Sequence, residues 1–248
     1  MAVKAFVSWS SGKDSACALA VAQRCGMIEV IGLLTTVNEP YDRVAMHGVR
    51  NSLLDRQIAA LGLPCVKVPL PHPCPMATYE ARMAEASVIV KARGADHVIF
   101  GDLFLKDVRA YREAQLARVG LRGLFPLWGR ATRALAEAVI ADGVAAYVAC
   151  LDPKQLDRGF AGRRFDRSFL AALPITVDPC GERGEFHTVV TDGPVFRTPI
   201  EVVVGQTVER DGFVFADIIP QEIRASGRYG QKNNLPSSTR RQDGRANS

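Results

Sequence analysis

A serine-rich segment near the start of the chain carries residues suited to holding phosphate. Ser8-Trp9-Ser10-Ser11-Gly12-Lys13-Asp14-Ser15 lies between an apolar β-branched run and an amphipathic stretch. A turn between a strand and a helix presents backbone N–H groups at the positive end of the helix, where they bind phosphate oxygens. Gly12 lets the backbone approach a ligand closely, Lys13 adds a positive charge, and three hydroxyls are further donors, those of Ser10, Ser11 and Ser15. The segment is not a Walker A loop, since Val7 stands where that motif requires its first glycine.

An ordinary capped helix start is the alternative interpretation of these residues. Asp14 and Ser15 both belong to residue types that are favoured at a helix N-cap. The position of the segment, directly after the first predicted strand and before the first predicted helix, favours phosphate binding.

Two aspartates are candidate Mg²⁺ ligands. Asp102 follows Gly101 at the end of a predicted strand, and ligands of open α/β sheets gather at the carboxyl ends of the strands. In nucleotide sites Mg²⁺ is held by one or two carboxylates together with phosphate oxygens, so we predict Asp102 as a ligand and Asp14 as a second one. A solvated or capping role is the alternative for both. His47, in a polar loop after the second predicted strand, is a candidate for contact with adenine or phosphate, and a loop histidine with hydrogen-bond partners explains it equally well.

A glycine-flexed segment in the second half brings together Glu182, Glu185 and His187. If this segment folds over the sheet edge, two carboxylates and an imidazole suit general-base catalysis. Three polar residues on a surface turn are the alternative.

A cluster of basic and aromatic side chains lies downstream of Asp102. It consists of Arg109, Tyr111 and Arg112. Guanidinium groups bind carboxylate or phosphate through two parallel hydrogen bonds, so we predict contacts to an acidic substrate or to pyrophosphate. Charges on the surface of a helix are the alternative.

The segment SSGKDS resembles the SGGxDS loop of the N-type ATP pyrophosphatases, with Ser11 in place of one glycine. Later segments resemble the diphthine–ammonia ligase family within that superfamily. They are Gly101-Asp102, Tyr111-Arg112-Glu113, Pro126-Leu127-Trp128, Gly181-Glu182-Arg183-Gly184-Glu185-Phe186-His187-Thr188 and Asp192-Gly193-Pro194. The resemblance covers residues 3–220, and GDLFLKDVRAYRE and GEFHT are more similar to its bacterial branch, which implies a carboxylate substrate other than diphthine.

The resemblance implies an enzyme that uses ATP and Mg²⁺ to adenylate a small-molecule or protein-borne carboxylate, releases pyrophosphate, and amidates the adenylate with ammonia. It implies catalytic roles for Lys13, Asp102, Glu182, Glu185 and His187. It implies nucleotide contacts from Ser10, Ser11, Gly12, Lys13, Asp14, Ser15, His47 and Gly101. Substrate contacts are implied for Arg109, Tyr111, Arg112 and Thr188. The fold implied is the doubly wound sheet of the adenine nucleotide alpha hydrolases.

The order of elements agrees with that fold, because apolar β-branched runs alternate with amphipathic stretches that stop at glycine. The predicted strands of the first half are Val3 to Ser8, Val30 to Thr36, Cys65 to Val68 and His97 to Gly101. The predicted helices are Ser15 to Cys25, Val49 to Leu61, Tyr79 to Arg93, Asp107 to Val119 and Ala131 to Ala141. The first four helices are followed by Gly26, Gly62, Gly94 and Gly120, where a left-handed cap favours glycine.

The second half reads differently. A strand is expected over 145–151, loops over 152–198, and two strands over 200–209 and 213–219 that meet at Asp211-Gly212, a sequence typical of a hairpin turn. We therefore predict a doubly wound parallel α/β domain over 1–122, a smaller mixed α/β domain over 123–222, and a disordered basic tail over 223–248.

Composition excludes a globally disordered chain, since 48% of the 248 residues are apolar and 23% are charged. The formal charge of +5 resides in the tail, because residues 1–222 carry 25 basic and 25 acidic side chains. A neutral folded part does not favour an extended nucleic-acid surface. Six cysteines without a CxxC pair predict buried reduced thiols. No apolar run suits a secretory signal or a membrane span, so a cytoplasmic protein without a membrane partner is expected.

Two other functions remain open from the sequence. Base modification of transfer RNA uses the same adenylation chemistry, but it requires a basic RNA surface and, in many thiolating enzymes, a cysteine pair. A nucleotide sensor without turnover is the other, and it requires less than Lys13 and the 181–188 segment provide. A homodimer is compatible with the sequence, which does not fix the oligomeric state.

Overall fold

The structure is a computed structural model that describes residues 2–221, so the predicted tail lies outside the described residues. Its first half contains β1 (Val3–Ser8), α1 (Lys13–Arg24), β2 (Ile28–Asn38), η1 (Glu39–Tyr41), β3 (Arg43–Val44), α2 (Asn51–Leu61), β4 (Cys65–Leu70), α3 (Met76–Ala92), β5 (His97–Ile99), α4 (Lys106–Ala117) and β6 (Arg122–Leu124). Its second half contains α5 (Thr132–Ala141), β7 (Ala145–Leu151), η2 (Arg158–Phe160), α6 (Arg167–Ala172), β8 (Phe186–Asp192), β9 (Val202–Arg210) and β10 (Phe213–Pro220).

The first sheet is built on parallel pairing around β1. Strand β4 pairs with β2, β2 with β1, β1 with β5 and β5 with β6, all in parallel, and the short β3 adds an antiparallel pairing to β2. Ala5 of β1 lies opposite Val30 of β2 on one side and His97 of β5 on the other. The strand order therefore reverses between β1 and β5, because β2 lies on one side of β1 and β5 on the other. Open α/β sheets bind their ligands at such a switch point.

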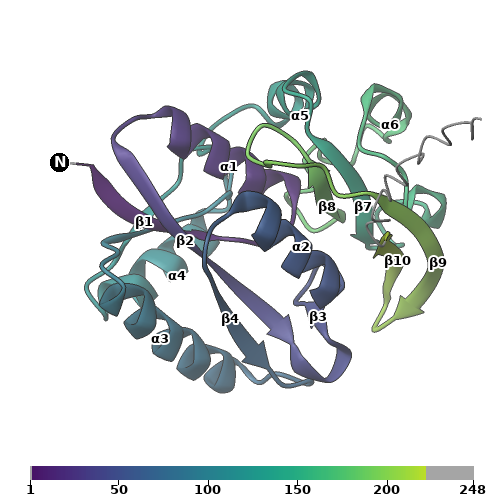
Figure 1. Ribbon diagram of the computed structural model, residues 1–248. Coiled ribbons are helices and arrows are strands. Elements are labelled where there is room, and N and C mark those ends of the chain that lie inside the picture. The colour runs from purple at the N-terminus through teal and green to yellow at the C-terminus, as the bar shows by residue number, and fades with distance from the viewer. Residues whose placement is uncertain (1, 222–248) are drawn as a thin grey trace, which may run out of the picture.

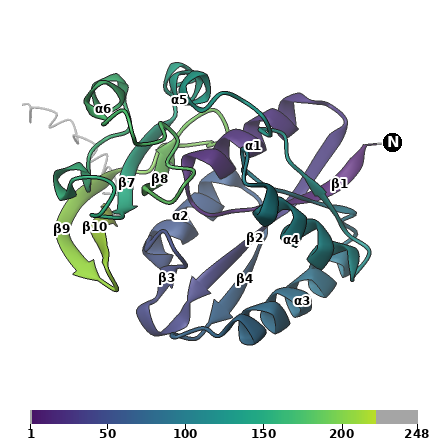
Figure 2. The same ribbon diagram turned by 180° about the vertical axis from the view of Figure 1, so that it is seen from behind.

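Helices cover both faces of this sheet (Figures 1 and 2). One hydrophobic cluster contains residues of α1 and α2, and a separate one contains residues of α3 and α4. The predicted doubly wound α/β fold is confirmed. The predicted left-handed caps are present too, since Gly26, Gly62, Gly94 and Gly120 all have φ between 64° and 88°.

The second sheet is antiparallel, with the strand order β8-β7-β10-β9. The hairpin predicted at Asp211-Gly212 joins β9 to β10, and both residues have positive φ, as a tight hairpin turn requires. The prediction of loops throughout 152–198 is wrong for β8 and α6. The β-branched run Thr188-Val189-Val190-Thr191 carried the signal for β8, and the glycines that precede it concealed the signal. Asp166, whose carboxylate accepts a hydrogen bond from the N–H of Phe169, caps α6.

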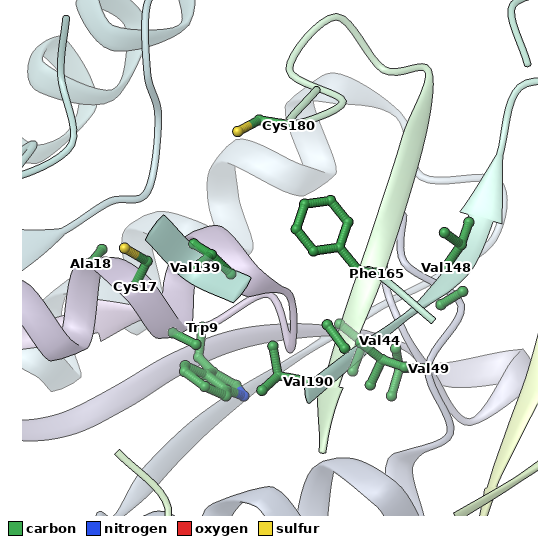
Figure 3. Close-up of a cluster of buried hydrophobic side chains, with 14 of the residues drawn as sticks. Trp9, Cys17, Ala18, Val44, Val49, Val139, Val148, Phe165, Cys180 and Val190 are labelled. Carbon is green, nitrogen blue, oxygen red and sulfur yellow. The ribbon is translucent and has the colours of Figure 1, made fainter. Parts of the chain in front are cut away.

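The two sheets share a core. The cluster in Figure 3 places Trp9 and Cys17 of the first half with Val139, Phe165 and Val190 of the second. The predicted division near residue 122 falls at the start of β6, which still pairs with β5 in the first sheet. Burial of one continuous apolar cluster fixes the second sheet against the strand ends of the first.

All six cysteines are free thiols, but the prediction that they are buried holds for half of them. Cys17, Cys150 and Cys180 are buried, Cys65 and Cys74 are half-buried, and Cys25 is exposed. Cys25 lies directly after the last residue of α1, at the end of the helix, where the chain reaches the surface.

Candidate active site

The turn between β1 and α1 has the geometry of a ligand loop. The N-cap of α1 is Gly12, in an extended conformation (φ −94°, ψ 170°), and no side chain caps the helix. Asp14 and Ser15 lie inside the first turn, so the capping interpretation of these two residues is wrong. Ser11 has φ 69°, a conformation that favours glycine, which explains the glycine found at this position in the related loops.

Gln57 of α2 connects this loop to β8 through side-chain hydrogen bonds. Its amide nitrogen donates to the carbonyl of Ser11 (3.2 Å) and to that of Val190 (2.7 Å), and its oxygen accepts from the indole N–H of Trp9 (3.0 Å). Gln57 is fully buried, so these bonds are shielded from water. Sequence reasoning missed this residue, because a single glutamine in an amphipathic helix carries no signal of its own.

Gly12 and Gly101 lie where two elements are in close contact, and a side chain at either position would push the elements apart. A Cβ on Gly12 would lie 2.8 Å from His47 Cε1 and 3.1 Å from the carbonyl of Thr188. A Cβ on Gly101 would lie 2.7 Å from the backbone carbon of Asp14. Both glycines are therefore required for the β1–α1 loop to pack against β8 and against the end of β5.

Lys13 is buried, with 1% of its surface exposed. Its ammonium donates to Asp14 Oδ2 (2.9 Å) and to the carbonyl of Cys180, and lies 5.4 Å from the ring centres of Phe165 and Phe186. Burial acts to lower the pKa of Lys13, but the Asp14 carboxylate and other neighbouring groups raise it, and the net direction is upward. Lys13 is therefore a buried, charged side chain that is held by a carboxylate, a carbonyl and two aromatic rings.

The two predicted metal ligands, Asp14 and Asp102, line the same cleft. Asp14 Oδ1 is buried and accepts no hydrogen bond within the described residues. Arg112 of α4 binds Asp102, with Nε 2.7 Å from Oδ2 and a second nitrogen 3.2 Å from Oδ1. No group of three His, Cys, Asp or Glu side chains suited to a metal occurs between residues 2 and 221. An unpartnered carboxylate oxygen beside a phosphate loop fits Mg²⁺, which takes most of its remaining ligands from phosphate and water.

Glu182 lines the same cleft as Asp14 and Asp102. Its carboxylate accepts a hydrogen bond from the N–H of Leu103 (2.7 Å). Burial, followed by the charges of Asp14 and Asp102, raises the pKa of Glu182 to about 7. A carboxylate with this pKa changes protonation near neutral pH, which suits a general base.

Two histidines, His47 and His187 of β8, lie against each other near the loop. The ring centres of His47 and His187 lie 4.6 Å apart, and His47 Nδ1 lies 2.9 Å from the carbonyl oxygen of Thr188. Burial lowers the pKa of both, that of His187 to about 3, with the neighbouring His47 adding to the effect. His187 is therefore neutral at physiological pH and offers a hydrogen bond without a charge.

Three predicted residues point elsewhere. The Glu185 carboxylate is buried and accepts hydrogen bonds from the N–H groups of Asp178 and Arg183, so it stabilises its own turn. Arg109 pairs with Glu113 and stacks on aromatic rings, and Tyr111 donates to Glu80. Of the cluster on α4, Arg112 alone reaches the site.

A cleft of about 890 Å³ unites the other predicted residues. It is lined by Ser10, Lys13, Asp14, Ser15, His47, Gly101, Asp102, Arg112, Glu182, His187 and Thr188. Ser11 and Gly12 belong to the same loop but are buried, and they do not line the cleft. The cleft also has an apolar side, to which Tyr79 and Met83 of α3 and Phe100, directly after β5, contribute. Tyr79 and Met83 are partly buried and also pack against the hydrophobic cluster beneath α3 and α4.

Family models confirm the resemblance found in the motifs. The diphthamide synthase N-terminal domain matches residues 3–123, and the diphthamide synthase C-terminal domain matches residues 131–219. The chain belongs to the diphthamide synthase family. A comparison with curated proteins returned no match.

Members of this diphthine–ammonia ligase family form carbon–nitrogen bonds at the expense of ATP, so the protein is an ATP-dependent enzyme of the ligase type. The boundary between the two matched domains falls between β6 and α5, and the cleft takes residues from both of them. Within residues 2–221, no helix is both long enough and apolar enough to cross a membrane.

Proposed function

We propose that this family member adenylates a carboxylate substrate with ATP and then amidates the adenylate with ammonia. The observation that carries the proposal is the shared cleft, in which Lys13 of the β1–α1 loop lies together with Glu182, from the segment before β8, and His187 of β8. Activation and amidation of one carbonyl require the two groups of residues at one place.

In the first step an oxygen of the substrate carboxylate attacks the α-phosphorus of ATP, and the bond to the β-phosphate breaks. Pyrophosphate leaves with the bonding electrons, so negative charge accumulates where the loop and Lys13 lie. A buried ammonium stabilises that charge strongly because little water screens it. Asp14 and Asp102 would hold Mg²⁺, which supplies further positive charge to the phosphates when bound.

In the second step ammonia attacks the carbonyl carbon of the acyl-adenylate, and AMP leaves. The nitrogen must lose a proton, and Glu182 is the group in the cleft whose pKa, about 7, suits that transfer. His187, with a pKa of about 3, is too weak a base for this role. It orients the carbonyl or the ammonia through a neutral hydrogen bond. Similarity to the bacterial branch supports a small-molecule or protein-borne acid other than diphthine.

The test is release of pyrophosphate and AMP from ATP in the presence of Mg²⁺, ammonium and a panel of carboxylic acids, scored by mass spectrometry. The full chain is compared with Lys13→Met and with the control Lys67→Met, whose ammonium binds Asn51 and Asp55 away from the cleft. We expect acid-dependent release in the wild type and in Lys67→Met, and a loss of about a hundredfold or more in Lys13→Met. Equal release by Lys13→Met in a folded state would exclude the mechanism.

A further inference from the structure

A smaller cavity opens beside the large cleft. It encloses about 250 Å³ between the segment after β2 and the β9–β10 hairpin. His187 lines both spaces, so the smaller cavity begins where the proposed acyl transfer takes place. Pockets for whole drug-sized ligands measure about 300–1,000 Å³, so this one suits a portion of a substrate whose remainder lies in the cleft.

The walls of this cavity are mainly apolar. Val44 and Ala216 are buried, Phe213 and Phe215 of β10 are half-buried, and Val208 of β9 closes the outer side with 44% exposure. Such walls release water readily and gain free energy when they contact an apolar body.

The two arginines of the cavity, Arg43 and Arg210, differ in their partners. Arg43 and Arg50 share one carboxylate, that of Asp217, so each of these two guanidinium groups already has an ionic partner. The guanidinium carbon of Arg210 lies 4.2 Å from the ring centre of Tyr41, and Arg210 forms no ion pair with any residue between 2 and 221.

Stacking on Tyr41 uses the face of the Arg210 guanidinium and leaves its N–H groups, which lie in the plane, free for an anion. Asp211, the next residue, does not occupy them. Its carboxylate lies 3.6 Å from His72 Nε2 on the other side of the rim. The cavity thus combines an apolar interior with one planar cation, Arg210, that has no ion-pair partner among residues 2–221.

We propose that this cavity binds the far end of the carboxylate substrate, and that the substrate is a dicarboxylic acid with an apolar middle. One carboxylate reacts beside His187, the apolar middle contacts Phe213 and Phe215, and the second carboxylate binds Arg210. This assignment rests on the proposed function, since it names the acid that is activated in the cleft.

The probes are two series of acids that differ by one group, straight-chain dicarboxylates from succinate to suberate and the monocarboxylates of equal length. Binding to the full chain is measured by calorimetry without ATP, and ATP binding is measured in parallel. The variants are Arg210→Gln, which removes the cation, and Val208→Trp, which fills the cavity from its exposed rim. Val203→Trp is the matched control, because Val203 lies on the same strand with the same 44% exposure and does not line the cavity.

We expect at least one dicarboxylate to bind about tenfold or more tightly than its monocarboxylate partner, and Arg210→Gln to abolish that preference. Val208→Trp should weaken both series, Val203→Trp neither, and ATP affinity should be unchanged in all three variants. Equal binding of the two series by the wild type, no binding of either, or a preference that survives Arg210→Gln would each overturn the proposal.

Failure of the proposed function has a different signature. It would appear as dicarboxylate binding with the expected response to Arg210→Gln, together with no pyrophosphate release from ATP by any acid. Pyrophosphate release that depends on monocarboxylates as well as on dicarboxylates would uphold the ligase function and overturn the assignment of the second carboxylate.

Discussion

The backbone N–H of Lys13 donates a hydrogen bond of 3.1 Å to the hydroxyl of Thr188, which lies 175 residues later in the chain. The bond is buried and joins the first turn of α1 to β8. It places the phosphate loop of the first sheet and the GEFHT segment of the second in one fixed arrangement, and it depends on the absence of a side chain at Gly12.

Thr188→Val should therefore weaken both the fold and the site. A valine preserves the shape but leaves the buried N–H of Lys13 without an acceptor, at a cost of about 1–3 kcal/mol in the free energy of unfolding. ATP affinity should fall by about tenfold, because the loop loses its support. Urea unfolding and calorimetry measure the two effects. Thr191→Val is the control on the same strand, since the Thr191 hydroxyl makes only a long bond of 3.4 Å to Ala145, and a larger loss there would contradict the prediction.

Ser11→Gly should raise stability. Ser11 has φ 69°, its buried hydroxyl has no partner among the described residues, and a left-handed conformation costs a residue with a side chain about 1–2 kcal/mol. We expect a gain of about 1 kcal/mol in urea unfolding after the greater flexibility of unfolded glycine is deducted. Ser11→Ala keeps the strained backbone and should gain less. A glycine variant less stable than the alanine variant would show that the strain is absent.

Gln57→Leu should be the most destabilising single change near the site. It removes the acceptor of the Trp9 indole and the donor to the carbonyls of Ser11 and Val190, all of them buried. The Ser11 carbonyl still accepts a hydrogen bond from the N–H of Val190 (2.9 Å), so the loss concerns the Trp9 indole and the Val190 carbonyl. Buried groups that lose a partner cost about 1–3 kcal/mol each, so we expect a loss of about 3 kcal/mol in thermal or urea unfolding. Ile58→Leu, at the next position of α2, is a volume-conserving control and should cost about 1 kcal/mol or less. Similar losses in both variants would refute the role of the amide.

The stability of the protein should depend on pH through His187. Burial lowers the pKa of His187 to about 3 in the folded state, below its ordinary value of 6.5, so the unfolded chain binds more protons between these two values. The contribution of His187 is therefore complete above pH 6.5 and is lost as the pH falls toward 3. Its replacement by asparagine, His187→Asn, should reduce the loss of unfolding free energy between pH 7 and pH 4.

Glu182 acts in the opposite direction in part of this range. Its folded pKa of about 7 lies above the ordinary 4.5, so its contribution declines as the pH rises from 4.5 to 7. The quantity to compare is thus the difference between the wild type and His187→Asn at each pH, measured by urea unfolding. A difference that stays constant from pH 7 to pH 4 would show that His187 titrates normally.

The sequence by itself determined four strands of the first sheet, β1, β2, β4 and β5, and the helices that connect them, but not the short β3 and β6. Strand and helix signals depend on residues that are neighbours in the chain, such as β-branched runs and the glycines after each helix, so they can be recognised without the fold. The position of Ser11-Gly12-Lys13 between a strand and a helix could be predicted for the same reason, because the turn is a local structure.

The tertiary structure decided which polar residues face the cleft. Glu182, Glu185 and His187 are equivalent by spacing, yet Glu185 turns into its own loop, and Arg112 reaches Asp102 while Arg109 does not. The direction of each side chain depends on the pairing of β8 with β7, including its irregularity between Val148 and Cys150, and on the packing of α4. Contacts between residues far apart in the chain set these directions, and no local pattern in the sequence encodes them.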